Sequence, residues 1–222
     1  MKPRRVLLTS GLLLLLAGCR AEAWRDYHFT VPVEYYFSYP TTTDLGGAPP
    51  LFIALLGEGR SPLDCIELFQ QFAEDRFYAL LCPDLGGEEG LADRVQAERD
   101  LADVLTDLYT QYDFESKFFL TGFGDGGEFA LEYGLKYPGS VSGISAMSVD
   151  SYPETFGATG TMPVQILVGE SDTDRLAAAQ EIEEAWRARG VLVRLLTVGG
   201  DGGAPNQAFA RLASEVIDQF DN

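Results

Sequence analysis

Short apolar runs alternate with helical segments along most of this chain, and this alternation constrains the fold more than any other feature. Runs such as LFIALLG at 51–57 are apolar at almost every position, as strands buried on both faces of a sheet are. The apolar runs lie at 51–57, 77–83, 116–124, 141–149, 163–172 and 191–200. A pair of strands rich in aromatic residues is expected before them, within 26–40. The pattern predicts an α/β fold, with a mostly parallel central sheet of about eight strands and helices on both faces.

The segments between these runs carry helix signals. Ser61 and Pro62 stand where a helix cap and a first helical residue are expected. Apolar residues recur at helical spacing in 92–112 and again in 206–220. In sheets of this kind the functional crevice lies at the carboxyl ends of the strands, so the loops there are the ones to search for a site.

The N-terminus carries the most specific targeting signal in the chain. A basic start precedes an apolar run that has the length of a signal-peptide core and is short for a membrane span. The run ends in Leu-Ala-Gly-Cys at 16–19, which resembles the lipobox of bacterial lipoproteins. The resemblance implies a lipoprotein signal peptide at 1–18, diacylation of Cys19, a lipidated tether at 19–25 and a folded domain at 26–222. An uncleaved anchor helix is the alternative.

The net charge and the export signal limit the kinds of partner that the chain can have. The formal net charge is −18 at pH 7, which argues against nucleic acid as a partner, because nucleic-acid binding needs basic patches. Lipid on Cys19 would make the membrane a partner and place the domain in the bacterial cell envelope. Arg20 stands in place of the aspartate that retains lipoproteins at the inner membrane of enteric bacteria, which favours the outer membrane or the cell surface.

The stretch LTGFGDGGEFALEYGLKYP at 120–138 resembles the nucleophile turn of the α/β-hydrolase superfamily. There a strand runs into the pattern small-x-nucleophile-x-small-small, because larger flanking side chains would collide in so tight a turn. The three small positions are Gly122, Gly126 and Gly127. This register places Gly124, which has no side chain, at the nucleophile position. Shifting it by one residue would make Asp125 the nucleophile and put Phe123 at a small position.

The resemblance extends from about Tyr27 to the C-terminus, and it is to the small, lidless, esterase-like members of the family. In these proteins the loop after the third strand supplies backbone donors to an oxyanion hole. Here that loop implies oxyanion-like backbone groups at Gly57 and Glu58, joined by Asp125 after the turn. The Glu58 carboxylate would repel the negative charge that such a pocket stabilises.

Two further loops correspond to the acid and the base of the catalytic triad. ILVGESDTD at 166–174 places the acid at Asp172, for which an ordinary helix-capping role is the alternative. VGGDGGAPN at 198–206 places the base at Gly203, which has no group to accept a proton. The single histidine, His28, lies in the first expected strand, at the far edge of the sheet from the turn, and is interpreted as a strand residue.

Acyl transfer on this fold needs a nucleophile and a base within hydrogen-bonding reach, and both positions hold glycine. A serine paired only with a carboxylate is a poor substitute, because a carboxylate is too weak a base for an alcohol. An acidic rim could offer oxygen ligands to a metal, but its residues lack any dedicated spacing, so no metal and no cofactor is predicted. The rim residues are Glu58, Asp84, Asp125, Asp172 and Asp201.

Export implies an oxidising compartment, in which Cys65 and Cys82 could form a disulfide or remain two small buried residues. On a hydrolase-like fold they fall near the start of the first helix and at the end of the next strand, which favours the disulfide. The sequence therefore predicts a lipid-anchored, non-catalytic envelope protein that binds a small ligand or an envelope protein. The alternatives are a hydrolase with an unusual constellation, built on Asp125 or a metal, and a scaffold whose crevice binds nothing.

Overall fold

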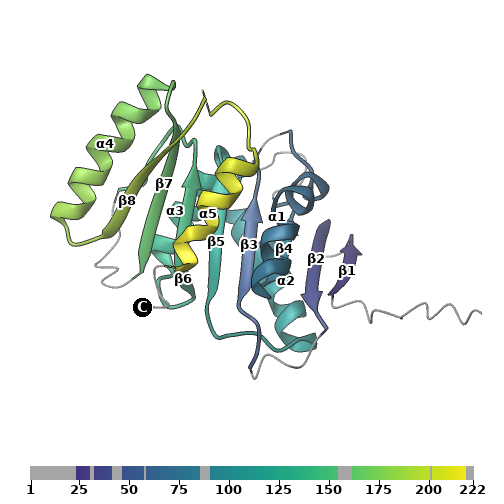
Figure 1. The fold of residues 1–222 in the computed structure, drawn as a ribbon. Helices are drawn as coiled ribbons and strands as arrows, with labels where there is room; N and C mark the ends of the chain where they lie inside the picture. Colours follow the sequence, from purple (N-terminus) through teal and green to yellow (C-terminus); the bar gives the residue numbers. More distant parts are fainter. Residues whose placement is uncertain are drawn as a thin grey trace, which may run out of the picture.

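The computed structural model describes residues 24–30, 33–41, 47–57, 59–85, 91–154, 162–200 and 202–218. They form an eight-stranded sheet with helices on both faces, so the expected α/β architecture is confirmed (Figure 1). The strands are β1 (Trp24–Phe29), β2 (Tyr35–Pro40), β3 (Leu51–Leu55), β4 (Ala79–Pro83), β5 (Phe118–Phe123), β6 (Val141–Met147), β7 (Pro163–Gly169) and β8 (Leu192–Val198). The helices are α1 (Pro62–Arg76), α2 (Arg94–Gln111), α3 (Asp125–Lys136), α4 (Thr173–Ala188) and α5 (Gln207–Asp218).

The strands are arranged in the order β1-β2-β4-β3-β5-β6-β7-β8. β2 is antiparallel to both of its neighbours, and the other neighbouring pairs are parallel. From β3 the chain moves outward to β4 and then returns across β3 to β5, so the connections that leave β3 and β5 diverge. A crevice opens at the carboxyl ends of strands at such a switch point.

Two apolar layers hold the helices on the sheet. α2, α3 and α4 pack on one face, while α1 and α5 pack on the other (Figure 1). β3 and β4 are buried at every position, as their continuous apolar runs predict. α1 begins with a reciprocal cap, in which the Ser61 hydroxyl accepts from the Asp64 N–H and the Asp64 carboxylate accepts from the Ser61 N–H.

The described part of the chain begins inside a strand. β1 starts at Trp24, so Trp24 and Arg25, which the expected tether includes, are strand residues. The expected signal peptide and Cys19 lie outside the described residues, and lipidation remains a prediction. Within the described ranges, no helix combines the length and apolar character needed to cross a membrane.

A disulfide joins Cys65 to Cys82, with 5.9 Å between their Cα atoms. Cys65 lies near the start of α1 and Cys82 in β4, and both are buried. The bond therefore ties the first turns of α1 to the sheet, directly after the loop that leaves β3.

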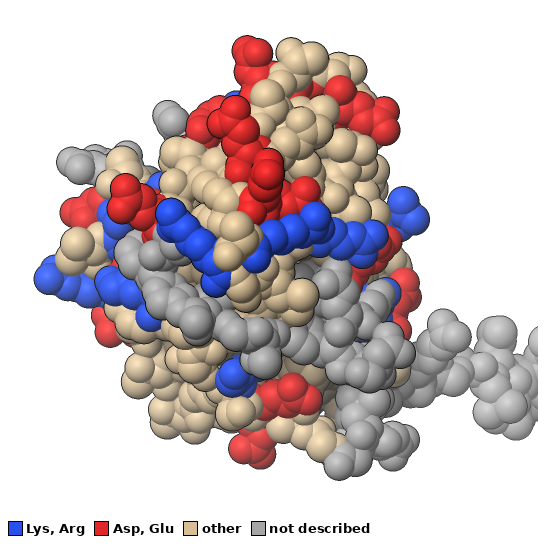
Figure 2. All heavy atoms as spheres, turned by 90° about the vertical axis from the view of Figure 1, so that its left-hand side faces the viewer, with Lys and Arg blue, Asp and Glu red and all other residues tan. Residues whose placement is uncertain are grey.

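The outer edge of β8 is covered by side chains of α4. The Leu195 N–H donates to the Glu183 carboxylate at 2.7 Å, and the Arg187 Nε donates to the Val193 carbonyl at 3.2 Å. Glu183 and Arg187 also form an ion pair at 2.9 Å. Figure 2 views this side of the molecule and shows acidic side chains gathered above a band of basic ones. Charged side chains that occupy an edge strand block its pairing with another chain.

Candidate functional site

The turn between β5 and α3 reverses the chain at Gly124. Its φ of 55° and ψ of −125° lie where a residue with a side chain is strained. The Gly124 N–H donates to the Met147 carbonyl of β6 at 2.9 Å, and the Gly124 carbonyl accepts from the Glu128 N–H at 3.0 Å. This sharp strand-to-helix turn is the geometry of a nucleophile elbow, and we call it the elbow.

The glycines around the elbow differ in the space that each one has. A methyl group on Gly122 would overlap the Gly126 carbonyl, and one on Gly126 would overlap the Leu55 carbonyl. Gly127 is similarly crowded, whereas a methyl group on Gly124 would meet no atom within 4 Å. The packing therefore requires glycine beside the turn, and position 124 faces open space.

The loop after β3 packs against the elbow through Gly57. A methyl group at Gly57 would lie 2.8 Å from the Phe123 carbonyl oxygen and 3.4 Å from the Asp125 nitrogen, so the two backbones are in direct contact. The Asp125 N–H is among the first of α3, and such groups have no partner within their own helix. The Asp125 N–H thus lies at the N-terminus of α3, beside the loop after β3, and its role as an oxyanion-type donor stays an expectation. Glu58 lies outside the described residues, and its effect on this pocket stays an expectation.

Asp172, the expected triad acid, caps α4. Its carboxylate accepts from the Arg175 N–H at 3.2 Å and forms an ion pair with the Arg175 guanidinium at 2.7 Å. The hydrogen bonds from the Arg175 side chain, and then from its backbone, hold the pKa of Asp172 below its ordinary value. Arg175 also pairs with Asp150 at 2.8 Å. The acid is therefore engaged by a cation of its own helix.

The loop that carries the expected base position is seated on the ends of β6 and β7. A methyl group on Gly202 would lie 2.9 Å from the Ser148 hydroxyl and 3.0 Å from the Gly169 nitrogen. Gly203 follows and is exposed. Asp201 lies outside the described residues. The loop thus reaches the strands next to the elbow, but it brings no imidazole there.

His28 stands apart from this site. It lies in β1, the strand at one end of the sheet, and its Nε2 is 2.9 Å from the Glu34 carboxylate. Its ring stacks on Tyr36 with 4.3 Å between ring centroids. His28 is therefore a strand residue with local partners on β2 and the turn before it.

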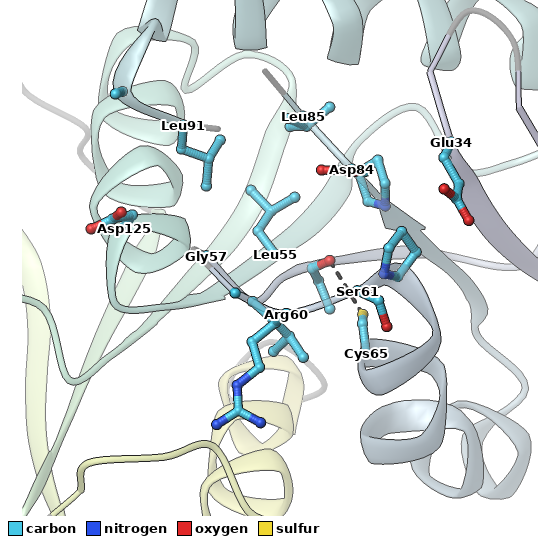
Figure 3. Close-up of a pocket in the computed structure, with 16 residues that line it drawn as sticks. Glu34, Leu55, Gly57, Arg60, Ser61, Cys65, Asp84, Leu85, Leu91 and Asp125 are labelled. Atoms are coloured by element: carbon cyan, nitrogen blue, oxygen red, sulfur yellow. Dashed lines mark hydrogen bonds between the residues drawn. The ribbon is translucent and has the colours of Figure 1, made fainter. Parts of the chain in front are cut away.

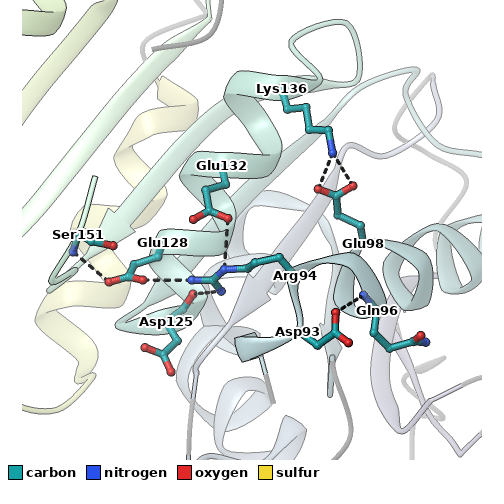
Figure 4. Close-up of polar contacts among 9 residues, drawn as sticks. All are labelled: Asp93, Arg94, Gln96, Glu98, Asp125, Glu128, Glu132, Lys136 and Ser151. Carbon is teal, nitrogen blue, oxygen red and sulfur yellow. Dashed lines mark hydrogen bonds and ion pairs between the residues drawn. The ribbon is translucent and has the colours of Figure 1, made fainter. Parts of the chain in front are cut away.

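A polar network that sequence reasoning missed fixes the loops around the elbow (Figure 4). Arg94, in the first turn of α2, reaches Glu128 of α3 at 3.1 Å and the Asp125 carbonyl at 3.2 Å. The other oxygen of the Glu128 carboxylate accepts the N–H groups of Asp150 and Ser151 at 3.2 and 3.0 Å. No local sequence pattern predicts these contacts, because each one joins segments that are far apart in the sequence.

A pocket of about 710 Å³ opens beside the elbow, at the carboxyl ends of β3 and β4. Leu55, Leu85 and Leu91 point toward one another at its centre (Figure 3). Its charged lining residues are three carboxylates, Glu34, Asp84 and Asp125, and one cation, Arg60. Burial raises the pKa of Asp84, and the charge of Glu34 raises it further. The pocket therefore combines apolar side chains with a charged lining in which three carboxylates outnumber one guanidinium, and this excess disfavours an anionic ligand.

The acidic rim does not assemble into a metal site in the part of the chain that the structure describes. There, no three histidine, cysteine, aspartate or glutamate side chains lie close enough to share an ion. Of the rim residues, Asp172 is held by Arg175, while Asp84 and Asp125 both line the pocket.

The geometry of the chain is shared with known hydrolases. The S-formylglutathione hydrolase FrmB of Staphylococcus aureus matches with a TM-score of 0.71 and 12% identity, over 88% of this chain and 96% of that one. An esterase of Pyrobaculum calidifontis matches with a TM-score of 0.69 and 13% identity, over 89% and 86%. FphF, a fluorophosphonate-binding serine hydrolase of S. aureus, matches with a TM-score of 0.62 and 13% identity, over 87% and 97%. The fold is that of the α/β-hydrolases.

The comparisons show the α/β-hydrolase fold and nothing further. No family model matches the chain, and no curated protein matches it. At identities of 12–13% the hydrolase structures speak for the fold alone, and function has to be argued from the site.

Proposed function

We propose that this protein is a lipid-anchored, α/β-hydrolase-fold protein of the bacterial cell envelope that binds a ligand without acyl-transfer chemistry. The observation that supports this most strongly is the elbow, where the backbone takes the nucleophile geometry and Gly124 offers no nucleophile. Covalent catalysis needs an attacking atom and a base to activate it. Gly124 and Gly203 supply neither group.

The remaining acid cannot replace the missing groups. Asp172 is bound to Arg175 on its own helix, and its lowered pKa makes it a still weaker base. Backbone donors at the elbow could still polarise a carbonyl. In a serine protease, what survives loss of the triad is roughly a 10³- to 10⁴-fold acceleration over water, far below ordinary turnover.

The pocket beside the elbow supports ligand binding as the role. Its volume of about 710 Å³ is within the usual range of roughly 300–1,000 Å³ for small-molecule sites. The leucines favour an apolar group, and the carboxylates of Glu34, Asp84 and Asp125, which outnumber the single guanidinium of Arg60, disfavour a negative one. We therefore propose a neutral or cationic small ligand with an apolar part, ahead of an envelope protein.

One alternative function has an observation in its favour. The similar structures are described as esterases and hydrolases, so this chain could hydrolyse an ester through an unusual group such as Asp125. Against it, Asp125 is the first residue of α3, one position past the turn. The crowded Gly122, Gly126 and Gly127 fix that register.

The two functions separate in an activity experiment on the mature chain. We expect no fluorophosphonate labelling, and turnover of p-nitrophenyl acetate and butyrate at least about 10³-fold below an ordinary kcat of about 10 s⁻¹. FphF, whose name describes fluorophosphonate binding, is the positive control. Labelling, or turnover at an ordinary rate, would overturn the proposal, and loss of that activity in Asp125→Asn would establish the alternative.

Ligand binding is tested separately by thermal shift with a library of neutral and cationic small molecules. A stabilising compound should raise the melting temperature of the parent chain. The shift should disappear in Ala92→Trp, which adds a large ring at an exposed residue of the pocket lining, and persist in Leu192→Trp on exposed β8. A shift that survives in Ala92→Trp would place the ligand elsewhere, and no shift at all would favour the scaffold without a ligand.

A further inference from the structure

A stacked aromatic pair, with one exposed and one half-buried ring, lies at the corner of the sheet where the described chain begins. Trp24 opens β1 and Phe77 follows the last residue of α1, and their rings stack with 6.2 Å between centroids. Phe77 is 38% exposed, and Trp24 is half-buried. We call the surface around Trp24 and Phe77 the N-terminal corner.

The backbone conformation of Phe77 is strained, so a phenylalanine at this position costs free energy. Phe77 has a φ of 58°, in the left-handed conformation that ends a helix. Glycine or asparagine usually occupies such a position, and a bulky residue is an outlier there. Strain of this kind points from an observed outlier to a hypothesis of function. A partner that contacts the ring would account for a phenylalanine at this position.

The other face of the same corner is aromatic as well. A groove of about 680 Å³ there is lined by Tyr27, Tyr39, Tyr112 and Phe114, together with Arg25. The Tyr39 hydroxyl donates to the Asp113 carbonyl at 3.3 Å, so the ring presents an apolar body and a polar tip. Aromatic residues of this kind are enriched where proteins meet the membrane–water interface.

The N-terminal corner lies at the opposite end of the sheet from the elbow (Figure 1). Trp24 pairs with Pro40, and the register of β2 with β4 puts Pro40 level with the residue before Ala79. Leu51, which pairs with Ala79, starts β3, and Leu55 at its other end pairs with Gly122 of the elbow. At about 3.3 Å per residue, the level of Trp24 and the level of the elbow are roughly 17 Å apart along the strands.

We infer that the N-terminal corner rests on the lipid bilayer, with the elbow crevice directed away from it. The inference rests on the proposed lipidation of Cys19. Residues 19 to 24 span at most roughly 17 Å when fully extended, so a lipid on Cys19 holds Trp24 close to the headgroups. The corner offers aromatic rings to the bilayer. Because the formal net charge of the chain is −18, attraction to anionic lipid is disfavoured, and the contact is carried by the rings.

The chain carries its own reporter for this contact. It has two tryptophans, and Trp186 is only 1% exposed, so Trp24 is the one that lipid can reach. The lipidated mature chain is reconstituted in phosphatidylcholine vesicles with brominated acyl chains. We expect the bromines to quench Trp24 emission about twofold or more. Acrylamide should quench it less in vesicles than in a soluble Cys19→Ser chain, and Trp186→Phe isolates the signal.

Two outcomes of this experiment overturn the inference in different ways. A chain that carries lipid by mass and floats with vesicles, but whose Trp24 escapes bromolipid quenching, is anchored without resting on this corner. A chain that carries no lipid and does not float with vesicles would overturn both the proposed lipid anchor and the proposed orientation.

A matched pair of variants separates docking from folding. Phe77→Asn keeps a residue suited to the left-handed position and removes the ring. It should lower bromolipid quenching of Trp24 about twofold while the melting temperature stays within a few degrees. Leu192→Asn, at a 54% exposed position on β8 at the far edge, should leave quenching unchanged. Equal quenching in Phe77→Asn and the parent chain would overturn the role of the ring.

Discussion

The guanidinium of Arg175 lies 2.7 Å from the carboxylate of Asp172, so the residue at the position of the triad acid is neutralised by its own helix. In a working triad this carboxylate orients the imidazole and stabilises its positive form. Here the guanidinium of Arg175, which is always charged, binds the carboxylate instead. At the three positions where a triad is expected, the chain thus has Gly124, Gly203 and an aspartate that is bound by arginine, and the last of these features is visible only in the structure.

Replacing Arg175 with methionine should raise the pKa of Asp172 toward its ordinary value, because the hydrogen bonds that lower it are lost. A depressed pKa means that the pair stabilises the fold above the unfolded pKa of about 4, and that this contribution is lost as pH falls through the folded value. Arg175→Met should lose about 1 kcal/mol at pH 7 and less at pH 3. Carboxyl NMR titration and urea unfolding measure both, with Asp150→Asn as a control that keeps the Asp172 pair.

Restoring the catalytic groups should work only when Arg175 is also removed. Gly124→Ser with Gly203→His supplies a hydroxyl and an imidazole, but Asp172 stays bound to Arg175. Adding Arg175→Met frees the carboxylate to orient the imidazole, and fluorophosphonate labelling should become about tenfold faster or more. Equal labelling with and without Arg175 would contradict this. A structure of the variant in which the introduced hydroxyl and imidazole lie far apart would show that the last loop is misassigned.

Alanine substitutions should rank the glycines by their surroundings. Gly122→Ala places its methyl group on the Gly126 backbone and should cost about 3 kcal/mol or more. Gly124→Ala meets no atom but keeps a φ of 55°, so about 1–2 kcal/mol is expected. Gly139→Ala, which has open space and no positive φ, should stay within about 0.5 kcal/mol of the parent. Urea unfolding measures the series, and a larger cost at Gly124 than at Gly122 would shift the register of the elbow.

Removing the disulfide should destabilise the domain without changing the fold. The bond joins residues separated by 17 positions, which corresponds to about 3 kcal/mol in the chain-entropy model. Cys65→Ala with Cys82→Ala should lose about that amount in denaturant unfolding. Reductant should lower the melting temperature of the parent chain and leave that of the double variant unchanged, and an effect on both would assign the loss to another cause.

Uncovering β8 should make the chain self-associate. Glu183 and Arg187 occupy the outward-facing Leu195 N–H and Val193 carbonyl. Glu183→Ala with Arg187→Ala leaves these groups open to a second chain, so light scattering should detect concentration-dependent dimers. Glu183→Gln keeps an acceptor and should keep the association state of the parent, and added association in both variants would argue against edge pairing.

The fold was predictable because its signals are local. Buried strands such as β3 and β4 read as continuous apolar runs, and the Ser61 cap with Pro62 marks the start of α1. The elbow was predictable for a related reason, since the crowding at Gly122 and Gly126 forces glycine at a fixed spacing. Steric requirements of this kind can be recognised in the sequence as glycines at a fixed spacing.

The partners of the site residues were not predictable. Arg175 follows Asp172 on one helix, but nothing in the sequence says that it also reaches Asp150 across the top of the sheet. Arg94 likewise meets Glu128 only because α2 and α3 pack on the same face. Charged side chains are common on helices, and their tertiary contacts depend on three-dimensional packing that sequence spacing does not encode.

The unstrained turn at Gly124 has a consequence for how such a protein can change over time. A serine in this backbone conformation is held at an energetic cost that only its catalytic use repays, whereas glycine adopts it freely. Glycine at position 124 therefore leaves a more relaxed scaffold than serine would, with stability to spare for mutations in the surrounding loops. A chain with glycine at this turn can therefore accept changes in the loops that line its pocket more readily than a chain with serine there.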